Sequence, residues 1–496
     1  MSTNDREDNA VPRLAETYAE VEDALLSRWP EQRIDPSLDR IRDLVELLGD
    51  PQSAYPVVHL TGTNGKTSTA RMVETLLVGL GLRTGRYTSP HLESMTQRIV
   101  LDGEPISPER FVAAFNDVAP YLSMVDADHD APLSFFETIT AMAFAAFADA
   151  PADAAVVEVG MGGTWDATNV ADGVVAVLTP IAMDHEQYLG STIAEIAREK
   201  AGIIKPGATV VSAAQEDDAL AVIQQRCAEV GATLLLEGVD FAVTSRVPAV
   251  GGQLLGLQGV RASYDEVFLP VYGAHQAHNA VLALVAVESL VGSDEPLDGE
   301  VVGEAFGQVT SPGRLEIVRR SPTIVLDAAH NPHGARAVVD AVGDSFAFDP
   351  LIGVVGVMAD KDHEQLLSVL EPVLGHIVCT QNSLSRSLPA EALAEEAEGI
   401  FGVDRVSVEP VLSDAIAAAA TLAESGGVFG EAIGSGAVLV TGSVVTVGEA
   451  RALLVREEAK PVTVSGAVAE PESDSVDDDP LSALEADLED GLGTER

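Results

Sequence analysis

One short segment combines the residue types that bind nucleotide phosphates. Residues Thr61–Ser68 read Thr-Gly-Thr-Asn-Gly-Lys-Thr-Ser, between an apolar run and a helical pattern. Glycines let backbone N–H groups approach an anion, and the positive end of the following helix adds to the attraction. Lys66 can reach the β- and γ-phosphates, and the Thr67 hydroxyl follows it. The alternative is a chance glycine-rich turn, but the strand–loop–helix context favours an ATP site.

The spelling of this loop departs from the general phosphate-loop consensus. The first consensus glycine falls on Leu60, and Gly62 stands two positions later. The spelling is typical of ligases that use ATP to make an amide on a carboxylate. Other motifs recur in the same order: Thr88–Leu92, Leu133–Glu137, Glu158–Asn169, Asp184–His185, Leu189–Gly190, Arg198–Ile203, His275–Asn279, Pro312–Arg314, Asp327–Pro332 and Asp360–Asp362. Over about residues 30–455 the chain resembles the folylpolyglutamate synthase/dihydrofolate synthase family of the Mur ligase superfamily.

A carboxylate at the end of an apolar run indicates a metal site. Glu158 ends the segment Ala154–Glu158, and the carboxyl ends of parallel strands are where ligand sites lie. Magnesium prefers hard oxygen ligands and bridges to phosphate. The resemblance implies two Mg²⁺ ions, with Ser89, Glu158 and His185 as protein ligands. A ligand histidine must be neutral and needs an orienting partner, which the sequence does not identify.

Lys200 has two interpretations. It could be a solvated helix lysine paired with a glutamate such as Glu195. The resemblance implies instead that Lys200 is carbamylated to N6-carboxylysine, which would face the second magnesium ion. A desolvated lysine loses its proton more easily, and the neutral amine can take CO2. With Lys66, His185 and Glu158, it completes the catalytic set that the resemblance implies.

The charge balance restricts the partners. A formal charge of −49 repels nucleic-acid backbones, so we expect no nucleic-acid partner. Anionic substrates then need local positive charge. Its candidate sources are Lys66, Arg86, Arg98, Arg314 and Arg336. The resemblance assigns ATP to Thr63, Asn64, Gly65, Lys66, Thr67, Asn279, Arg314 and Asp327, and it places His330 near the glutamate or the interdomain cleft.

A pterin ring requires flat apolar walls and a few directed polar groups. Phe135 and Phe136 could supply the walls, although either could instead be core. The resemblance assigns the folate or pteroate to Arg33, Ile34, Asp35, Pro36, Ser134, Phe135, Phe136, Glu137, Trp165, Asp166 and Ala167. Two positions depart from the family pattern: Thr164 replaces an arginine, and Gln97 replaces an acidic residue. Both bear on acceptor choice rather than on ATP.

Strand and helix patterns predict an α/β protein. Short β-branched runs alternate with helices, which is typical of a parallel sheet buried on both faces. We expect a three-layer P-loop ATPase-like domain with a mostly parallel sheet over residues 1–308. A smaller Rossmann-like α/β domain should follow over 309–461, and an acidic disordered tail over 462–496. The stretch 233–272, rich in Val, Leu and Gly, is expected to be antiparallel.

These features predict an enzyme that joins L-glutamate to dihydropteroate or a folate through an acyl phosphate, using ATP. One alternative is a Mur-type ligase that adds an amino acid to a peptidoglycan precursor. Another is a P-loop ATPase that uses hydrolysis mechanically or as a switch. Two cysteines, a polar N-terminus and the absence of a long apolar run predict a cytoplasmic protein with no membrane partner. A monomer is the expectation from the family.

Overall fold

The computed structural model describes residues 14–30, 33, 35–425 and 436–458. The expected acidic tail, 462–496, and the candidate Ile34 lie outside these residues. The fold class predicted from the sequence is confirmed, since two mostly parallel sheets are each covered by helices. Among the described residues, no helix is long and apolar enough to cross a membrane.

The first sheet contains eight strands in the order β4-β3-β2-β5-β1-β6-β7-β8. The strands are β1 (Val57–Thr61), β2 (Thr84–Tyr87), β3 (Ile99–Leu101), β4 (Glu104–Pro105), β5 (Ala154–Glu158), β6 (Gly173–Leu178), β7 (Thr209–Ser212) and β8 (Thr233–Leu236). Six of them run parallel, and β3 and β4 add an antiparallel edge. Every residue of the central strands β1 and β5 is buried, which explains why most of their residues are apolar.

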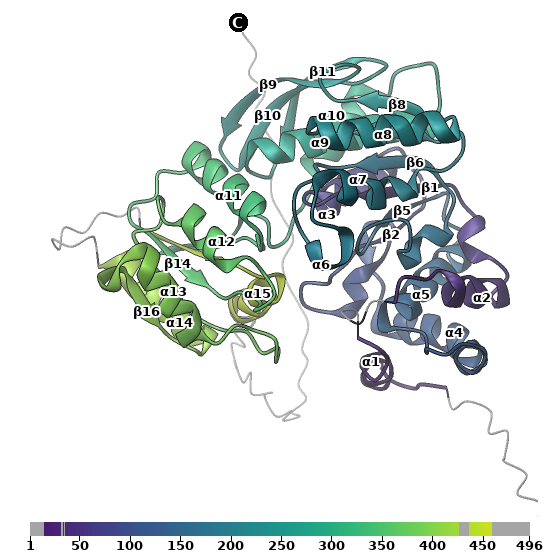
Figure 1. Ribbon diagram of the computed structural model, residues 1–496. Helices are drawn as coiled ribbons and strands as arrows, with labels where there is room; N and C mark the ends of the chain where they lie inside the picture. The colour runs from purple at the N-terminus through teal and green to yellow at the C-terminus, as the bar shows by residue number, and fades with distance from the viewer. Residues whose placement is uncertain (1–13, 31–32, 34, 426–435, 459–496) are drawn as a thin grey trace, which may run out of the picture. The chain divides into compact units, whose positions relative to one another are not determined.

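Helices cover both faces of this sheet (Figure 1). They are α1 (Tyr18–Leu26), α2 (Asp39–Leu47), α3 (Lys66–Gly79), α4 (Pro108–Asp128), α5 (Phe135–Asp149), α6 (Glu186–Leu189), α7 (Ile193–Lys200), α8 (Asp217–Val230), α9 (Ala274–Val291) and α10 (Gly299–Gly307). Short 3-10 helices are η1 (Pro51–Ser53), η2 (Met95–Arg98), η3 (Ala167–Val170) and η4 (Ala201–Ile203). Val58 and Leu60 pack with α3, α9 and α10, while Val57 packs with α1, α2, α4 and α5. Successive residues of β1 therefore pack into the hydrophobic cores on opposite faces of the sheet.

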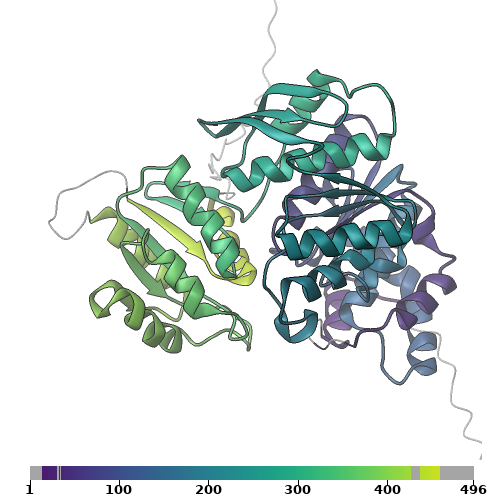
Figure 2. The same ribbon diagram turned by 45° about the horizontal axis from the view of Figure 1, so that its top comes forward.

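A three-stranded antiparallel sheet lies beside α9 (Figure 2). Its strands are β9 (Ala242–Ala249), β10 (Gly252–Gln258) and β11 (Ser263–Leu269). The prediction that all of 233–272 is antiparallel is wrong at its start, because β8 pairs parallel with β7. Helix α8 joins these two strands, and a helical crossover is the connection that parallel pairing requires.

The second α/β sheet has the order β12-β13-β17-β14-β15-β16, and only β12 is antiparallel to its neighbour. Its strands are β12 (Glu316–Arg320), β13 (Thr323–Leu326), β14 (Leu351–Val355), β15 (His376–Cys379), β16 (Val406–Val408) and β17 (Ala437–Thr441). Its helices are α11 (Pro332–Ser345), α12 (His363–Leu370), α13 (Ala390–Phe401), α14 (Leu412–Glu424) and α15 (Val444–Glu458), with the 3-10 helix η5 (Val403–Arg405). α11, α12 and α13 cover one face, and α14 and α15 cover the other.

A buried ion pair links α3 to β2. Arg86 Nε donates to Glu74 Oε2 at 2.5 Å, and the two side chains are 2% and 4% exposed. Arg86 also donates to the Thr88 hydroxyl at 3.2 Å. Arg86 was a candidate for holding a substrate anion, but this position assigns it a structural role. It fixes the helix that follows the phosphate loop against the strand beside β5.

We predict that Arg86→Met lowers the free energy of unfolding by about 3–5 kcal/mol, because it leaves the Glu74 charge buried and unpaired. Replacing both partners by methionine should restore much of the loss, since no charge is then stranded. Arg83→Met is the matched control, because Arg83 pairs with Asp153 at the surface and should change stability little. Urea unfolding measures all three. Equal losses for Arg86→Met and Arg83→Met would contradict the assignment.

Candidate functional site

The loop between β1 and α3 is fixed by hydrogen bonds to the segment that follows β6. The Thr63 hydroxyl donates to Ala182 O at 2.9 Å, and Thr63 N donates to Pro180 O at 2.9 Å. Gly62 and Gly65 have φ angles of 149° and 90°. A Cβ on Gly62 would lie 1.9 Å from Thr179 Oγ1. The backbone of the loop can take this path only with glycine at these positions.

Two lysines converge on one carbonyl of this loop. Lys66 Nζ donates to Gly62 O at 3.1 Å, and Lys200 Nζ donates to the same oxygen at 2.8 Å. Burial, and secondarily the charge of Lys66, lowers the pKa of Lys200 to about 7. Lys200 is 4% exposed, so the solvated-lysine interpretation does not fit its position. Its place at the end of α7, whose N-cap is Thr192, directs it toward the phosphate loop.

Glu158 places a buried carboxylate beside the loop. It ends β5, is 1% exposed, and accepts from the Thr67 hydroxyl at 2.9 Å and from Ser89 N at 3.4 Å. Burial raises its pKa despite the nearby Lys66. Carboxylate and hydroxyl oxygens suit a magnesium ion that takes its other ligands from water and phosphate. Within the described part of the chain, no three His, Cys, Asp or Glu side chains gather to form a metal site by themselves.

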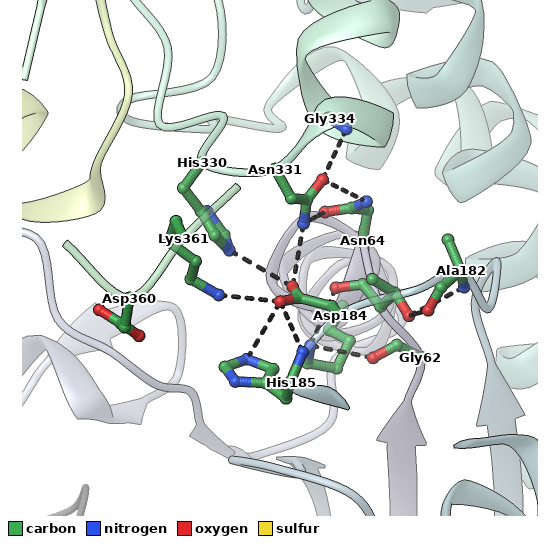
Figure 3. A network of polar contacts seen from close by, with 12 residues as sticks. Gly62, Asn64, Ala182, Asp184, His185, His330, Asn331, Gly334, Asp360 and Lys361 are labelled. Atoms are coloured by element: carbon green, nitrogen blue, oxygen red, sulfur yellow. Dashed lines mark hydrogen bonds and ion pairs between the residues drawn. The ribbon is translucent and has the colours of Figure 1, made fainter. Parts of the chain in front are cut away.

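Asp184 is the acidic neighbour of His185. His185 adopts φ 53°, its backbone N–H donates to Asp184 Oδ1 at 2.9 Å, and its ring Nε2 lies 3.8 Å from that oxygen, which is beyond hydrogen-bond distance. Burial lowers the pKa of His185 to about 4, so the ring is neutral at pH 7. Figure 3 shows Lys361, His330 and Asn331 converging on the same Asp184 carboxylate.

The candidate ATP, metal and catalytic residues all line one cavity of about 930 Å³. They are Thr63, Asn64, Gly65, Lys66, Thr67, Ser89, Glu158, His185, Lys200, Asn279, Arg314 and Asp327. Asn279 on α9 reaches Gly65, since a Cβ there would lie 2.6 Å from Asn279 Oδ1. Asp327 is buried, and its oxygens accept from Leu315 N and Ala329 N, both at 2.9 Å. The cavity also includes His330 and Arg336.

The described candidates for the pterin are outside the lining of this cavity. Ser134 and Glu137 form a capping box at the start of α5, and Glu137 pairs with Arg40 at 3.1 Å. Phe135 is 4% exposed and belongs to the core.

Several other candidates also have internal partners. Asp35 pairs with Arg40, and Asp166 caps η3, where Ala167 is buried. Arg33 lies over the Trp29 ring. Pro36 is exposed in the segment before α2, and Trp165 packs partly against the cluster around α7 and α8. Two candidates contact lining residues of the cavity: Phe136 packs beside Gly160, and Asp166 Oδ2 accepts from Met161 N at 2.9 Å.

The two departures from the family pattern have local structural roles. The Thr164 hydroxyl donates to Glu199 O at 3.0 Å, next to Lys200. Gln97 Oε1 accepts from Leu92 N at 3.0 Å and Glu93 N at 2.9 Å. Asp184, Asn331 and Lys361 lie within the sequence motifs, but the sequence predicted no role for them. The only signal in the sequence was their position: Asp184 and Asn331 each adjoin a candidate histidine, and Lys361 is the middle residue of Asp360–Asp362.

Family models match both parts of the chain that carry these residues. Residues 60–287 match the Mur ligase middle domain, and residues 313–444 match the Mur ligase glutamate ligase domain. With the phosphate loop, the lysine pair and the buried carboxylate in one cavity, the fold and site define an ATP-dependent ligase of the Mur superfamily.

The chain belongs to the dihydrofolate synthase/folylpolyglutamate synthase family. It is 49% identical over 457 residues to dihydrofolate synthase/folylpolyglutamate synthase of Mycobacterium tuberculosis, covering 88% of this chain and 94% of that protein. It is 32% identical over 372 residues to the Escherichia coli protein of the same name, covering 75% and 83%.

Solved structures agree with this membership. The M. tuberculosis folylpolyglutamate synthase complexed with ADP and AMPPCP superimposes with a TM-score of 0.84 at 48% identity, covering 88% of this chain and 98% of that one. E. coli FolC in complex with DHPP and ADP gives a TM-score of 0.76 at 28% identity, covering 90% and 100%. These relatives favour the folate branch over a peptidoglycan ligase or a mechanical ATPase.

We predict that Gly65→Ala weakens AMPPCP binding by about tenfold or more, because its Cβ would meet Asn279 and displace the loop. Gly81→Ala is the matched control. Gly81 has a similar φ of 80° but no atom within 4 Å of the added Cβ, so it carries only the strain of a left-handed residue. Calorimetric titration with AMPPCP measures both. Equal affinities would show that the approach of Asn279 is not needed.

Proposed function

We propose that this protein joins L-glutamate to the carboxylate of dihydropteroate or of a folyl glutamate, acting as both a dihydrofolate synthase and a folylpolyglutamate synthase. The observation that carries the proposal is that every described candidate for ATP, metal and catalysis lines one cavity. The chain's similarity to enzymes named for these activities supports the choice of substrates.

In this reaction the acceptor carboxylate oxygen attacks the γ-phosphorus of ATP, and ADP leaves. The amine of L-glutamate then attacks the acyl carbon, phosphate leaves, and a proton is lost to give the amide. Lys66 and the loop N–H groups stabilise the negative charge on the transferring phosphoryl group. Arg314 adds positive charge from the segment before β12. An acyl phosphate hydrolyses readily, so the walls of the cavity must also exclude water.

Two Mg²⁺ ions would neutralise phosphate charge in this site. We propose Glu158, Ser89 and His185 as protein ligands of these ions, with Thr67 beside them. The buried Glu158 carboxylate and the neutral His185 ring support this set. The pteroate roles of the second group of candidates remain predictions. Phe136 and Asp166 have the best support among them, through their contacts with the lining residues Gly160 and Met161.

The domain boundary near residue 309 is also a proposal. It is supported by the two family models, which end at 287 and begin at 313. We further infer that the protein acts as a monomer in the cytoplasm on small-molecule substrates, as its family membership suggests.

The first test is a product assay with ATP, Mg²⁺, L-glutamate, and dihydropteroate or tetrahydrofolate as competing acceptors. We expect glutamate-dependent ADP release and one new amide for each acceptor. Omitting glutamate is the control, because a mechanical ATPase would continue to release ADP. ADP release that glutamate does not stimulate with any pteroate or folate would sink the folate assignment.

The second test concerns carbamylation of Lys200. Because burial lowers the pKa of Lys200 to about 7, about half of the amine is neutral at pH 7 and about nine tenths at pH 8. The amine nitrogen can then attack CO2 and lose a proton, giving a carbamate. We expect a carbamate ¹³C signal from labelled bicarbonate that increases from pH 6 to pH 8. Lys200→Ala should lose this signal and most amide formation, and acetate or formate should partly restore activity. Full activity in the alanine variant would remove Lys200 from the mechanism.

A further inference from the structure

Asp184 connects segments far apart in the chain. Its Oδ1 accepts from Lys361 Nζ at 2.9 Å, and its Oδ2 accepts from Asn331 Nδ2 at 3.0 Å (Figure 3). His330 Nε2 lies 3.9 Å from Oδ2. The partners are 147 and 177 residues away in sequence. Asp184 follows β6 in the first sheet, while Lys361, Asn331 and His330 lie in connections of the second sheet.

The ion pair at this junction is shielded from water. The side chains of Asp184 and Lys361 are 11% and 14% exposed. Lys361 has acidic sequence neighbours at Asp360 and Asp362, yet it pairs with the distant Asp184. Asp360 pairs instead with Arg386, where both side chains are 43% exposed. A shielded pair of this kind depends strongly on geometry, whereas the exposed pair contributes little.

Asn331 connects Asp184 to the phosphate loop. Its Nδ2 donates to Asn64 Oδ1 at 3.3 Å as well as to Asp184. Its Oδ1 accepts from Gly334 N at 2.7 Å, which caps α11. Asn331 is buried, so its amide has little freedom to rotate. The start of α11 is therefore tied to the loop that we assign to the phosphates.

We propose that Asp184 and Lys361 are positioning residues whose ion pair holds the C-terminal α/β domain over the phosphate loop while the acyl phosphate waits for L-glutamate. This inference rests on the proposed function. With the pair intact, the amine of glutamate attacks the acyl carbon and phosphate leaves. Without it, water reaches the same carbon, and the products are the original carboxylate and phosphate. The pair therefore controls how ATP turnover is divided between amide formation and hydrolysis.

The first experiment compares ADP and amide formed by the wild type and by Lys361→Met. We expect the ratio of ADP to amide to rise and kcat/KM for glutamate to fall by about 10²-fold, because a small misplacement has that effect. AMPPCP affinity should fall less than kcat/KM for glutamate, because Asn64 and the loop remain in place, whereas Arg314 and Asp327 belong to the domain that the pair positions. A folding defect would lower all of these activities together. Lys361→Arg, which keeps the charge, should recover part of the coupling.

Arg386→Met is the matched control, because it removes an ion pair from the residue next to Lys361. It should leave the ratio of ADP to amide unchanged. A double-mutant cycle with Asp184→Asn tests whether the two residues act together. If they do, Asp184→Asn/Lys361→Met will be little worse than the more severe single variant. Additive losses, or an unchanged ratio in Lys361→Met, would overturn the proposal.

A measurement that needs no folate separates this inference from the proposed function. Spin labels can be placed at Met124→Cys and Val403→Cys, which are exposed positions on α4 and η5, while Cys227 and Cys379 are buried. With AMPPCP bound, the wild type should give a narrow distance distribution, and Lys361→Met a broader one. Identical distributions would reject the positioning role even if the enzyme forms the amide. A narrow-to-broad change would support it even if the acceptor were not a folate.

Discussion

The site depends on the sharing of one carbonyl, Gly62 O, by the ammonium groups of Lys66 and Lys200. Burial lowers the pKa of Lys200, and repulsion between the two neighbouring amino groups lowers it further. Phosphate charge would relieve this repulsion at Lys66, and conversion to a carbamate would reverse the charge of Lys200. A chain with a formal charge of −49 can therefore attract ATP because it concentrates scarce positive charge at one point.

The same concentration of charge explains why Asp184 lies where it does. Burial would raise its pKa, but His185, Lys361 and His330 outweigh burial and hold the pKa well below its usual range. The carboxylate therefore stays charged, and at pH 7 it balances the charge of Lys361, because the rings of His185 and His330 are then neutral. Lys361 would otherwise add to the repulsion around Lys66. The Asp184 side chain therefore balances positive charge and also connects the two sheets.

The sequence was sufficient to place residues whose position depends on local order along the chain. The phosphate loop, Glu158 at the end of β5 and Lys200 at the end of α7 are each fixed by their own element. It failed where contacts join distant segments, such as Asp184 with Lys361 and Glu137 with Arg40. Neither Asp184 nor Glu137 has its partner nearby along the chain, so the sequence predicted neither contact. Parallel pairing of β8 was missed for a similar reason, because its partner β7 lies beyond a helix.

The phosphate side and the proposed acceptor side of the site differ in the groups that form them. At the phosphate end, charged groups line the cavity and glycines fix the backbone. At the proposed acceptor end, Ser134, Glu137 and Asp166 already have internal partners that satisfy them. We propose that Phe136 supplies apolar contact to a pterin ring at this end. Since apolar contact discriminates weakly between ligands of similar shape, one site can accept both pteroate and folyl substrates, while the chemistry at ATP stays the same.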